Sequence, residues 1–184
     1  MAEPGRLSRV DRPDVPERLA LIGLGSNLGD PVAAVRAAIA ALGEVPSTRV
    51  LRHSRLFRTE PWGMVAQPAF VNAVAELATG LSARALLDQL LALERRHGRC
   101  RDGLRWGPRV IDLDLLSLGD LVLDQPGLTL PHPRLAERAF VLAPLADLGP
   151  ERVLPGIGRV GDLLARVDAA GCVPLLEVGH AGGE

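Results

Sequence analysis

Apolar residues recur along the chain in blocks whose spacing alternates between the periods of strands and helices. The first block, residues 19–25, is almost continuously apolar and predicts a buried strand. After a loop at 26–29, Asp30 and Pro31 form a helix N-cap with proline at the first helical position, and apolar residues then recur at helical spacing. Gly43 ends this helix. The ordered part of the chain therefore opens with a strand followed by a helix.

Two further strands and a second helix are predicted next. Residues 49–58 alternate as a strand and residues 70–77 predict another, with a substantial loop at 59–68 that holds two prolines and a glycine. Ser82 can cap a helix that runs to about His97, with an apolar stripe made of leucines.

The pattern in the second half of the chain completes the fold prediction. Its elements are a polar loop at 98–108, a strand at 112–116, a turn at 119–120, a short strand at 121–123, a helical segment around 138–142 and a last amphipathic helix at 160–167. The order β-α-β-β-α-β predicts an α+β protein with a ferredoxin-like core, in which helices pack on an antiparallel sheet. Residues 1–18 and 179–184 lack this patterning, so we expect a disordered leader and a flexible tail around one domain at 19–178.

Composition narrows the possible partners. The 184 residues are 47% hydrophobic, which suits a single domain with one buried core. A net charge of -1 provides no global field for nucleic acid or a membrane surface, and 3% aromatic residues are too few for an RNA-stacking platform. Cys100 and Cys172 form no CxxC pair, and no signal-peptide core or membrane-length apolar run is present. We therefore expect a cytoplasmic monomer that binds neither nucleic acid nor membrane.

A carboxylate pair follows an arginine-rich segment. Asp112 and Asp114 lie two residues apart on one predicted strand, so both point to one face of the sheet. Acidic groups in an apolar strand are costly unless they are paired or bind metal. Ion pairs with nearby arginines are one interpretation. A Mg²⁺ site completed by substrate phosphates is the favoured one, because this ion typically takes only one or two protein carboxylates.

The cationic residues near this pair are all arginines, because the chain contains no lysine. Arg99, Arg101 and Arg109 lie closest to the acids and are candidate phosphate ligands, whereas the remaining arginines of this stretch are expected to be solvated. Trp106, in the same loop, offers a stacking surface. His132, between two prolines, is either a turn residue or a donor to a phosphate oxygen.

Three glycines, at positions 23, 25 and 29, lie between the start of the first strand and the helix that follows it. They are open to three interpretations: a tight strand-to-helix turn, a backbone loop facing phosphate or substrate, or a dinucleotide fingerprint. The last is the weakest, because the acid expected about 20 residues on does not end a second parallel strand.

Several motifs occur in a characteristic order. They are Gly25-Ser26-Asn27, Arg58-Thr59-Glu60-Pro61, Gln67-Pro68-Ala69-Phe70-Val71-Asn72, Glu94 with Gly98-Arg99 and Arg101, Arg105-Trp106-Gly107-Pro108-Arg109 followed by Asp112-Leu113-Asp114, Pro131-His132-Pro133-Arg134, and Arg138-Ala139-Phe140. Together these motifs resemble the 6-hydroxymethyl-7,8-dihydropterin pyrophosphokinase family of folate biosynthesis, from about Leu19 to beyond Leu145.

The resemblance implies a ferredoxin-like fold and the transfer of the pyrophosphoryl group of ATP to the pterin hydroxymethyl group, with release of AMP. It implies that Asp112 and Asp114 hold two Mg²⁺ ions. The residues that it implies for ATP and its phosphates are Arg99, Arg101, Trp106, Arg109, Thr129, His132 and Arg138. The residues that it implies for the pterin are Phe70 and Phe140 as stacking rings, with Thr59, Pro61, Trp62 and Asn72 around its amide edge.

Two other functional classes stay open at this point. One is a noncatalytic module that binds a nucleotide through the arginine loop. The other is a metal-dependent nuclease or polymerase-like palm, which lacks an evident third carboxylate in this sequence.

Overall fold

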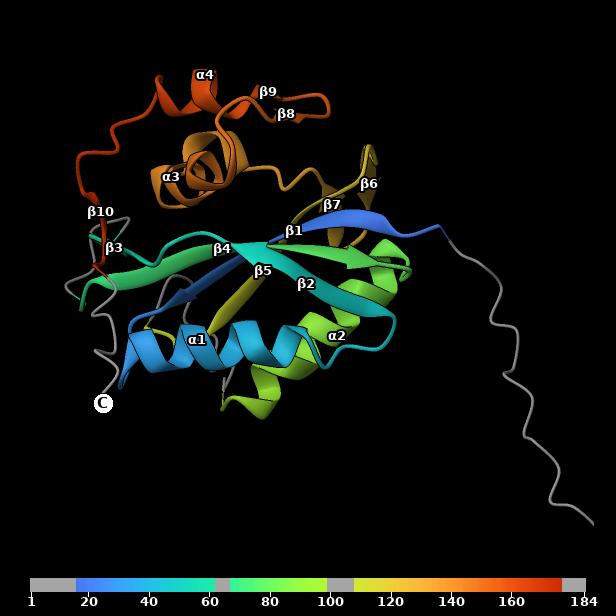
Figure 1. Ribbon diagram of the computed structural model, residues 1–184, viewed down its shortest axis with the longest axis horizontal. Helices are drawn as coiled ribbons and strands as arrows, with labels where there is room; N and C mark the ends of the chain where they lie inside the picture. Colours follow the sequence, from blue (N-terminus) through green and yellow to red (C-terminus); the bar gives the residue numbers. More distant parts are fainter. Residues whose placement is uncertain (1–15, 62–66, 99–107, 177–184) are drawn as a thin grey trace, which may run out of the picture.

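The main sheet of the protein carries helices on both faces (Figure 1). The computed structural model describes residues 16–61, 67–98 and 108–176. The strands of the main sheet are β1 (Arg18–Ser26), β2 (Thr48–His53), β3 (Phe57–Thr59), β4 (Phe70–Thr79), β5 (Asp112–Leu118) and β10 (Cys172–Pro174). The helices are α1 (Pro31–Leu42), α2 (Ala83–Arg96), α3 (Ala139–Leu148) and α4 (Val160–Leu164), with a 3-10 turn at Leu135–Glu137. Two small hairpins, β6 (Leu123–Gln125) with β7 (Leu128–Leu130) and β8 (Val153–Leu154) with β9 (Gly158–Arg159), lie outside this sheet.

The strand order is β10-β3-β4-β1-β5, with β2 also paired to β4, and all of these pairs are antiparallel. Each β-α-β unit therefore places its two strands on either side of a third strand, as in the ferredoxin-like split βαβ fold. The predicted α+β class and core topology are confirmed.

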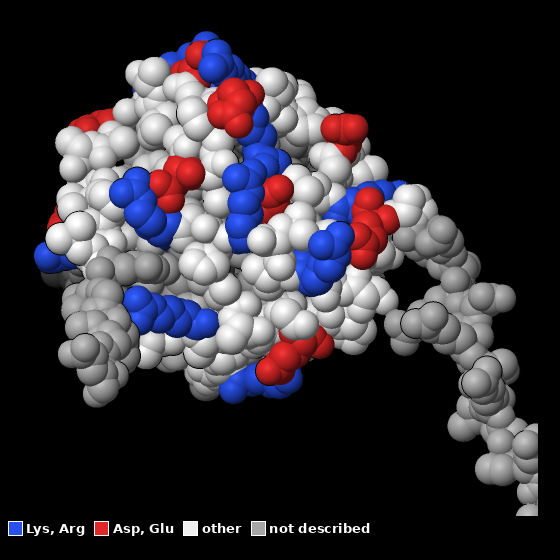
Figure 2. Space-filling model, viewed as in Figure 1, with Lys and Arg blue, Asp and Glu red and all other residues white. Residues whose placement is uncertain are grey.

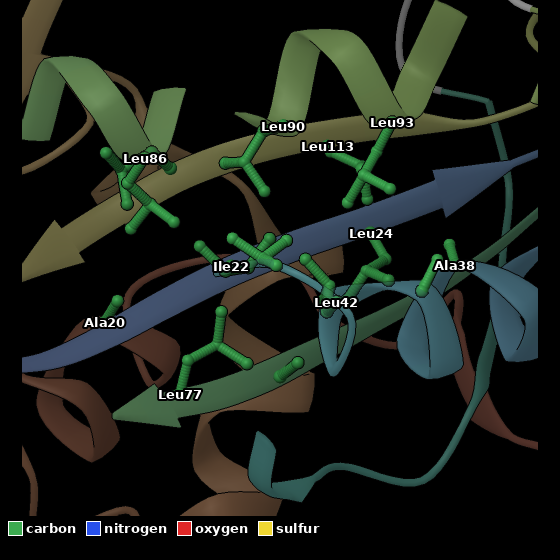
Figure 3. Close-up of a cluster of buried hydrophobic side chains, with 14 of the residues drawn as sticks. Ala20, Ile22, Leu24, Ala38, Leu42, Leu77, Leu86, Leu90, Leu93 and Leu113 are labelled. Atoms are coloured by element: carbon green, nitrogen blue, oxygen red, sulfur yellow. The ribbon is translucent and has the colours of Figure 1, made fainter. Parts of the chain in front are cut away.

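The two faces of the sheet have separate hydrophobic clusters. Leucines of α2 and the apolar face of α1 pack on alternate residues of β1 and β5, such as Ile22 and Leu113 (Figure 3). On the other face, Leu21 and Leu116 pack against α3 and α4. These alternating directions follow from the period of two in the strands, so Asp112 and Asp114 share the face of Leu116 and lie on the α3 side.

The predicted starts of α1 and α2 are confirmed by their caps. Asp30 Oδ1 accepts a hydrogen bond from the backbone N of Ala33 at 3.0 Å, and Ser82 Oγ accepts one from the backbone N of Ala85 at 3.2 Å. Each cap satisfies a backbone donor that the first helical turn leaves unpaired.

The prediction of one strand over 49–58 is wrong. The chain forms β2 and β3 instead, and residues 54–56 leave the ladder between them. The side chain of Ser54 causes the break, because its Oγ accepts a hydrogen bond from the backbone N of Val74 at 3.0 Å while its own N donates to the backbone O of Val74 at 2.9 Å. A serine side chain thus takes the place of a backbone partner.

Three other boundaries also differ from the prediction. The strand predicted at 121–123 is shifted to Leu123–Gln125, where it pairs with β7 across a turn at Pro126 and Gly127 (φ +72°). The last helix ends at Leu164 and not at residue 167. The first strand begins at Arg18, inside the predicted leader, whose residues 1–15 lie outside the described part, as does the predicted tail at 179–184.

On the face shown in Figure 2, basic and acidic side chains are interspersed over the described surface. Arg49 pairs with Glu17 at 2.9 Å and Arg55 pairs with Asp147 at 2.6 Å. Within the described residues, no helix combines the length and the apolar composition that a membrane crossing requires.

Candidate active site

A cavity of about 630 Å³ lies beside β5, a volume typical of small-molecule sites. The predicted site residues that line it are Phe70, Asn72, Arg109, Asp112, Asp114, Thr129, His132, Arg138 and Phe140. Thr59 does not line it but contacts Asn72, and Pro61 is described but does not line it. Trp62, Arg99, Arg101 and Trp106 lie outside the described residues.

Both carboxylates of the acid pair contact arginines. Asp112 accepts a hydrogen bond from Nη1 of Arg109, and Asp114 Oδ2 lies 3.4 Å from Nη1 of Arg138. The guanidinium carbon of Arg138 also lies 5.5 Å from the ring centroid of Phe140. The two carboxylates would repel one another, and the two arginines balance their negative charge. Both arginines are also close enough to the acids to contact a phosphate bound beside the acid pair.

The strand register places three cavity-facing positions in one row across the sheet. Gly25 of β1 is opposite Asn72 of β4 on one side and opposite Asp112 of β5 on the other. Paired residues of neighbouring antiparallel strands project to the same face, and two strand spacings amount to about 10 Å. An amide that can recognise a flat heterocycle thus lies about 10 Å from a carboxylate that can hold a metal.

Of the two glycines of β1, Gly25 provides the space between these groups. Gly23 and Gly25 are strand residues and not part of a loop, so the loop and fingerprint interpretations are wrong for both; only Gly29, at φ +64°, lies in the turn that follows. A Cβ at position 25 would lie 2.6 Å from Oδ1 of Asn72. Gly25 is therefore needed for the position of the Asn72 side chain.

The family resemblance implies that a pterin binds beside Asn72, and on that expectation Gly25→Ala should weaken its use. The added methyl group would displace the Asn72 carboxamide, whose Nδ2 donates to Oγ1 of Thr59 at 2.6 Å. The KM for the pterin should rise about tenfold, as for a lost hydrogen bond in a buried site, with the KM for ATP nearly unchanged. Gly23→Ala is the matched control, because its Cβ would meet Leu116 at an ordinary 3.4 Å. Equal pterin KM values for the two variants would contradict this explanation.

Asn27, for which the sequence predicted no role, connects the two segments that border the cavity. Its Oδ1 accepts from the backbone N of Arg109 at 2.7 Å, and its own N donates to the backbone O of Arg109 at 3.0 Å. Its Nδ2 donates to Gln67 Oε1 at 3.1 Å and to the Pro68 carbonyl at 3.2 Å. The buried Asn27 thereby holds Arg109 and Gln67, which both line the cavity.

Glu94 was also missed as a site residue. It lies on α2, is 2% exposed, and accepts from the backbone N of Leu113 at 2.8 Å, between the two aspartates. The outer edge of β5 is also bonded further along, where the His132 backbone N donates to the Leu116 carbonyl at 2.8 Å. The signal that could have identified Glu94 is an acid bordering the leucine stripe of a helix, because a buried carboxylate requires a donor.

His132 is neutral at physiological pH. Burial lowers its pKa to about 4, with the positive charges of Arg138 and Arg134 also lowering it and Asp112 opposing them. Its Nδ1 accepts a hydrogen bond from the backbone N of Arg134 at 3.2 Å, so the ring proton is on Nε2. His132 can therefore act as a neutral hydrogen-bond donor in the cavity.

The donor set suits Mg²⁺ shared with phosphates. Asp112 and Asp114 supply carboxylates on one face of β5, with side chains 20% and 38% exposed. Among the described residues, no group of three His, Cys, Asp or Glu side chains forms a complete metal cage. Two carboxylates in an open cavity match the coordination typical of Mg²⁺ when water and phosphates fill its other positions.

The fold and the cavity define a class. A ferredoxin-like sheet whose cavity combines an acid pair, several arginines and two phenylalanine rings is typical of an enzyme that transfers a phosphate-containing group from a nucleotide to a flat acceptor.

Comparison with known proteins identifies the family within that class. The model of the 7,8-dihydro-6-hydroxymethylpterin-pyrophosphokinase (HPPK) family matches residues 21–150. The 2-amino-4-hydroxy-6-hydroxymethyldihydropteridine pyrophosphokinase of Pseudomonas aeruginosa is 48% identical over 144 residues, covering 78% of this chain and 88% of the relative. The enzyme of the same name from Methylorubrum extorquens is 42% identical, covering 83% of this chain and 95% of the relative.

A solved structure agrees at the level of the fold. The Plasmodium falciparum HPPK-DHPS triple mutant with SDX-DHP superposes with a TM-score of 0.65 at 14% identity, over 83% of this chain. The present chain spans only 44% of that longer protein. The chain belongs to the HPPK family. It is a pyrophosphokinase that uses ATP, and its reaction is pyrophosphoryl transfer to hydroxymethyldihydropterin in folate biosynthesis.

Proposed function

We propose that this transfer takes place in the cavity beside β5, with the pterin at the Phe70, Asn72 and Phe140 end and the ATP phosphates at the Asp112 and Asp114 end. The observation that carries the proposal is the row of Asn72, Gly25 and Asp112 across the sheet. It supports a site in which the acceptor and the phosphates lie side by side on one face.

The chain's own residues act mainly by positioning. The acceptor hydroxyl oxygen forms a bond to the β-phosphorus of ATP while the bond between that phosphorus and the oxygen bridging it to the α-phosphorus breaks, so AMP leaves. In such transfers the protein aligns the groups and balances the charge that develops on the phosphate oxygens. Arg109 and Arg138 are placed to contact those oxygens, and neutral His132 can donate to another from Nε2.

Asp112 and Asp114 would hold the Mg²⁺, as two ions by the family resemblance. When bound, the metal supplies charge neutralisation of the triphosphate. Arg109 and Arg138, which now contact these acids, could turn to the phosphates when metal occupies the carboxylates. We also expect the protein to act as a cytoplasmic monomer.

The nucleotide product tests this function. ATP, Mg²⁺ and 6-hydroxymethyl-7,8-dihydropterin should yield AMP and the pterin diphosphate, resolved by ion-exchange chromatography. Formation of ADP, or of AMP without pterin, would rule the proposal out. Calorimetry of ATP binding, with Mg²⁺ and with EDTA, distinguishes the enzyme from the noncatalytic nucleotide-binding module. The module should bind ATP equally well in EDTA, whereas the enzyme should require Mg²⁺.

A further inference from the structure

The last strand of the sheet lies beyond the part of the chain that matches the family model. That match ends at residue 150, whereas β10 comprises Cys172–Pro174 and pairs with the outer edge of β3. Figure 1 shows β10 beside β3, next to β4. The outer edge of the short strand β3 is thus covered by a segment from the C-terminal part of the chain.

Two cross-strand rows connect β10 to the pterin end of the cavity. In the first, Cys172 is opposite Thr59, which is opposite Phe70. In the second, Pro174 is opposite Phe57, which is opposite Asn72. Both cavity residues of β4 therefore rest against β3, and β3 is only three residues long. Such a short strand depends on its neighbours for a defined position.

The residue that follows β10 fastens it. The backbone N of Leu175 donates to the Leu56 carbonyl at 2.7 Å, just before β3 begins. Its side chain packs against the core cluster on the α1 and α2 face. The side chain of Val173, in contrast, is directed outward and is 56% exposed. Leu175 is therefore the anchor of this segment, and Val173 is not.

The polar contact that depends on this arrangement lies between β3 and β4. Thr59 is 3% exposed, and its Oγ1 accepts the hydrogen bond from Asn72 Nδ2 at 2.6 Å. A bond this well shielded from water orients the carboxamide, because neither group has solvent as an alternative partner. If the edge of β3 opened, water would compete for both groups.

We propose that β10, anchored by Leu175, is a positioning element of the pterin subsite: it holds β3 so that Thr59 fixes the carboxamide of Asn72. The proposal rests on the pterin position given above. Leu175 is a positioning residue and contacts no substrate. The acid pair of the phosphate end lies on β5, at the opposite edge of the sheet, so the effect should be confined to the pterin.

The test uses full-length variants and two separate ligands. Leu175→Pro removes the N–H and replaces the leucine side chain with a smaller ring that reaches less far into the core. Leu175→Met keeps the N–H and a long apolar side chain, and Val173→Ala is the control on the same strand. Calorimetry with oxidised 6-hydroxymethylpterin should give a Kd about tenfold higher for Leu175→Pro, as for one lost hydrogen bond, with the Kd for α,β-methylene-ATP and Mg²⁺ changed by less than about twofold. Leu175→Met and Val173→Ala should bind both ligands as the parent protein does.

Asn72→Ala separates the failure of this inference from the failure of the proposed site. If Asn72→Ala weakens pterin binding and Leu175→Pro does not, β10 has no positioning role. If Leu175→Pro weakens both ligands equally at a temperature where it is folded by circular dichroism, its role is only structural and the inference is wrong. If Asn72→Ala leaves the pterin Kd unchanged, the pterin binds elsewhere, and both proposals are overturned.

Discussion

Asp114→Ala is expected to abolish turnover while the protein remains folded. The side chain is 38% exposed at the cavity, so its loss leaves no hole in the core. It would remove one of the two carboxylates proposed to hold Mg²⁺. A metal that neutralises the charge on a transferring phosphate stabilises the transition state by several kcal/mol. Without it, kcat should fall about 10³-fold. The rate of AMP formation measures the loss, and thermal unfolding followed by circular dichroism shows whether the fold persists.

Asp120→Ala is the matched control for this prediction. Asp120 is an exposed acid in the turn directly after β5, so its replacement removes the same charge from nearly the same segment. We expect it to retain normal activity. An Asp114→Ala variant that still formed AMP at the parent rate would show that this carboxylate holds no essential metal.

The helices and strands that the sequence predicted correctly are those whose caps and apolar spacing lie within a few residues of one another along the chain. Asp30 and Ser82 are N-caps in the sequence and in the structure, and the apolar stripes of α1 and α2 follow them directly. The alternation in β5 also predicted that Asp112 and Asp114 share a face. Each of these inferences depends only on backbone geometry and local hydrogen bonding.

The elements that were missed depend on partners distant in the sequence. β10 is three residues long and includes a proline, so nothing in its own pattern identifies a strand; it forms because β3 offers an unpaired edge. Ser54 interrupts the predicted strand only because Val74 lies opposite it. The hairpin of β6 and β7 is an exception, since Pro126-Gly127 is a recognisable turn signal.

The site shows the same division between local and long-range information. The sequence places Asp112 near Arg109, but only the strand register shows that Gly25 lies between Asn72 and Asp112. The three interpretations left open for the glycines did not include the role that Gly25 has in the sheet, where the lack of a side chain leaves space for Asn72. The residues assigned to the pterin came from the family resemblance, because a phenylalanine or an asparagine in an apolar strand has no chemical signal of its own.

Among the arginines that the structure describes, Arg138 should be the one whose replacement is most damaging to the reaction. It is 9% exposed and lies between the two ends of the cavity, with its guanidinium 3.4 Å from Asp114 and its central carbon 5.5 Å from the Phe140 ring centroid. One planar group thus borders both the proposed metal ligand and the proposed pterin ring.

Arg138→Ala is expected to lower kcat/KM about 10²–10³-fold, the usual loss when one preorganised donor to a transition-state oxygen is removed. Arg138→Lys keeps the charge but loses the planar fork and the stacking surface, so it should restore only part of the activity. Arg36→Ala, on the exposed side of α1, removes the same charge and should have little effect. The measurement is kcat and KM for each substrate, with thermal unfolding to confirm the fold. Full activity in Arg138→Lys would mean that a point charge is sufficient at this position, and that the geometry of the guanidinium is not part of catalysis.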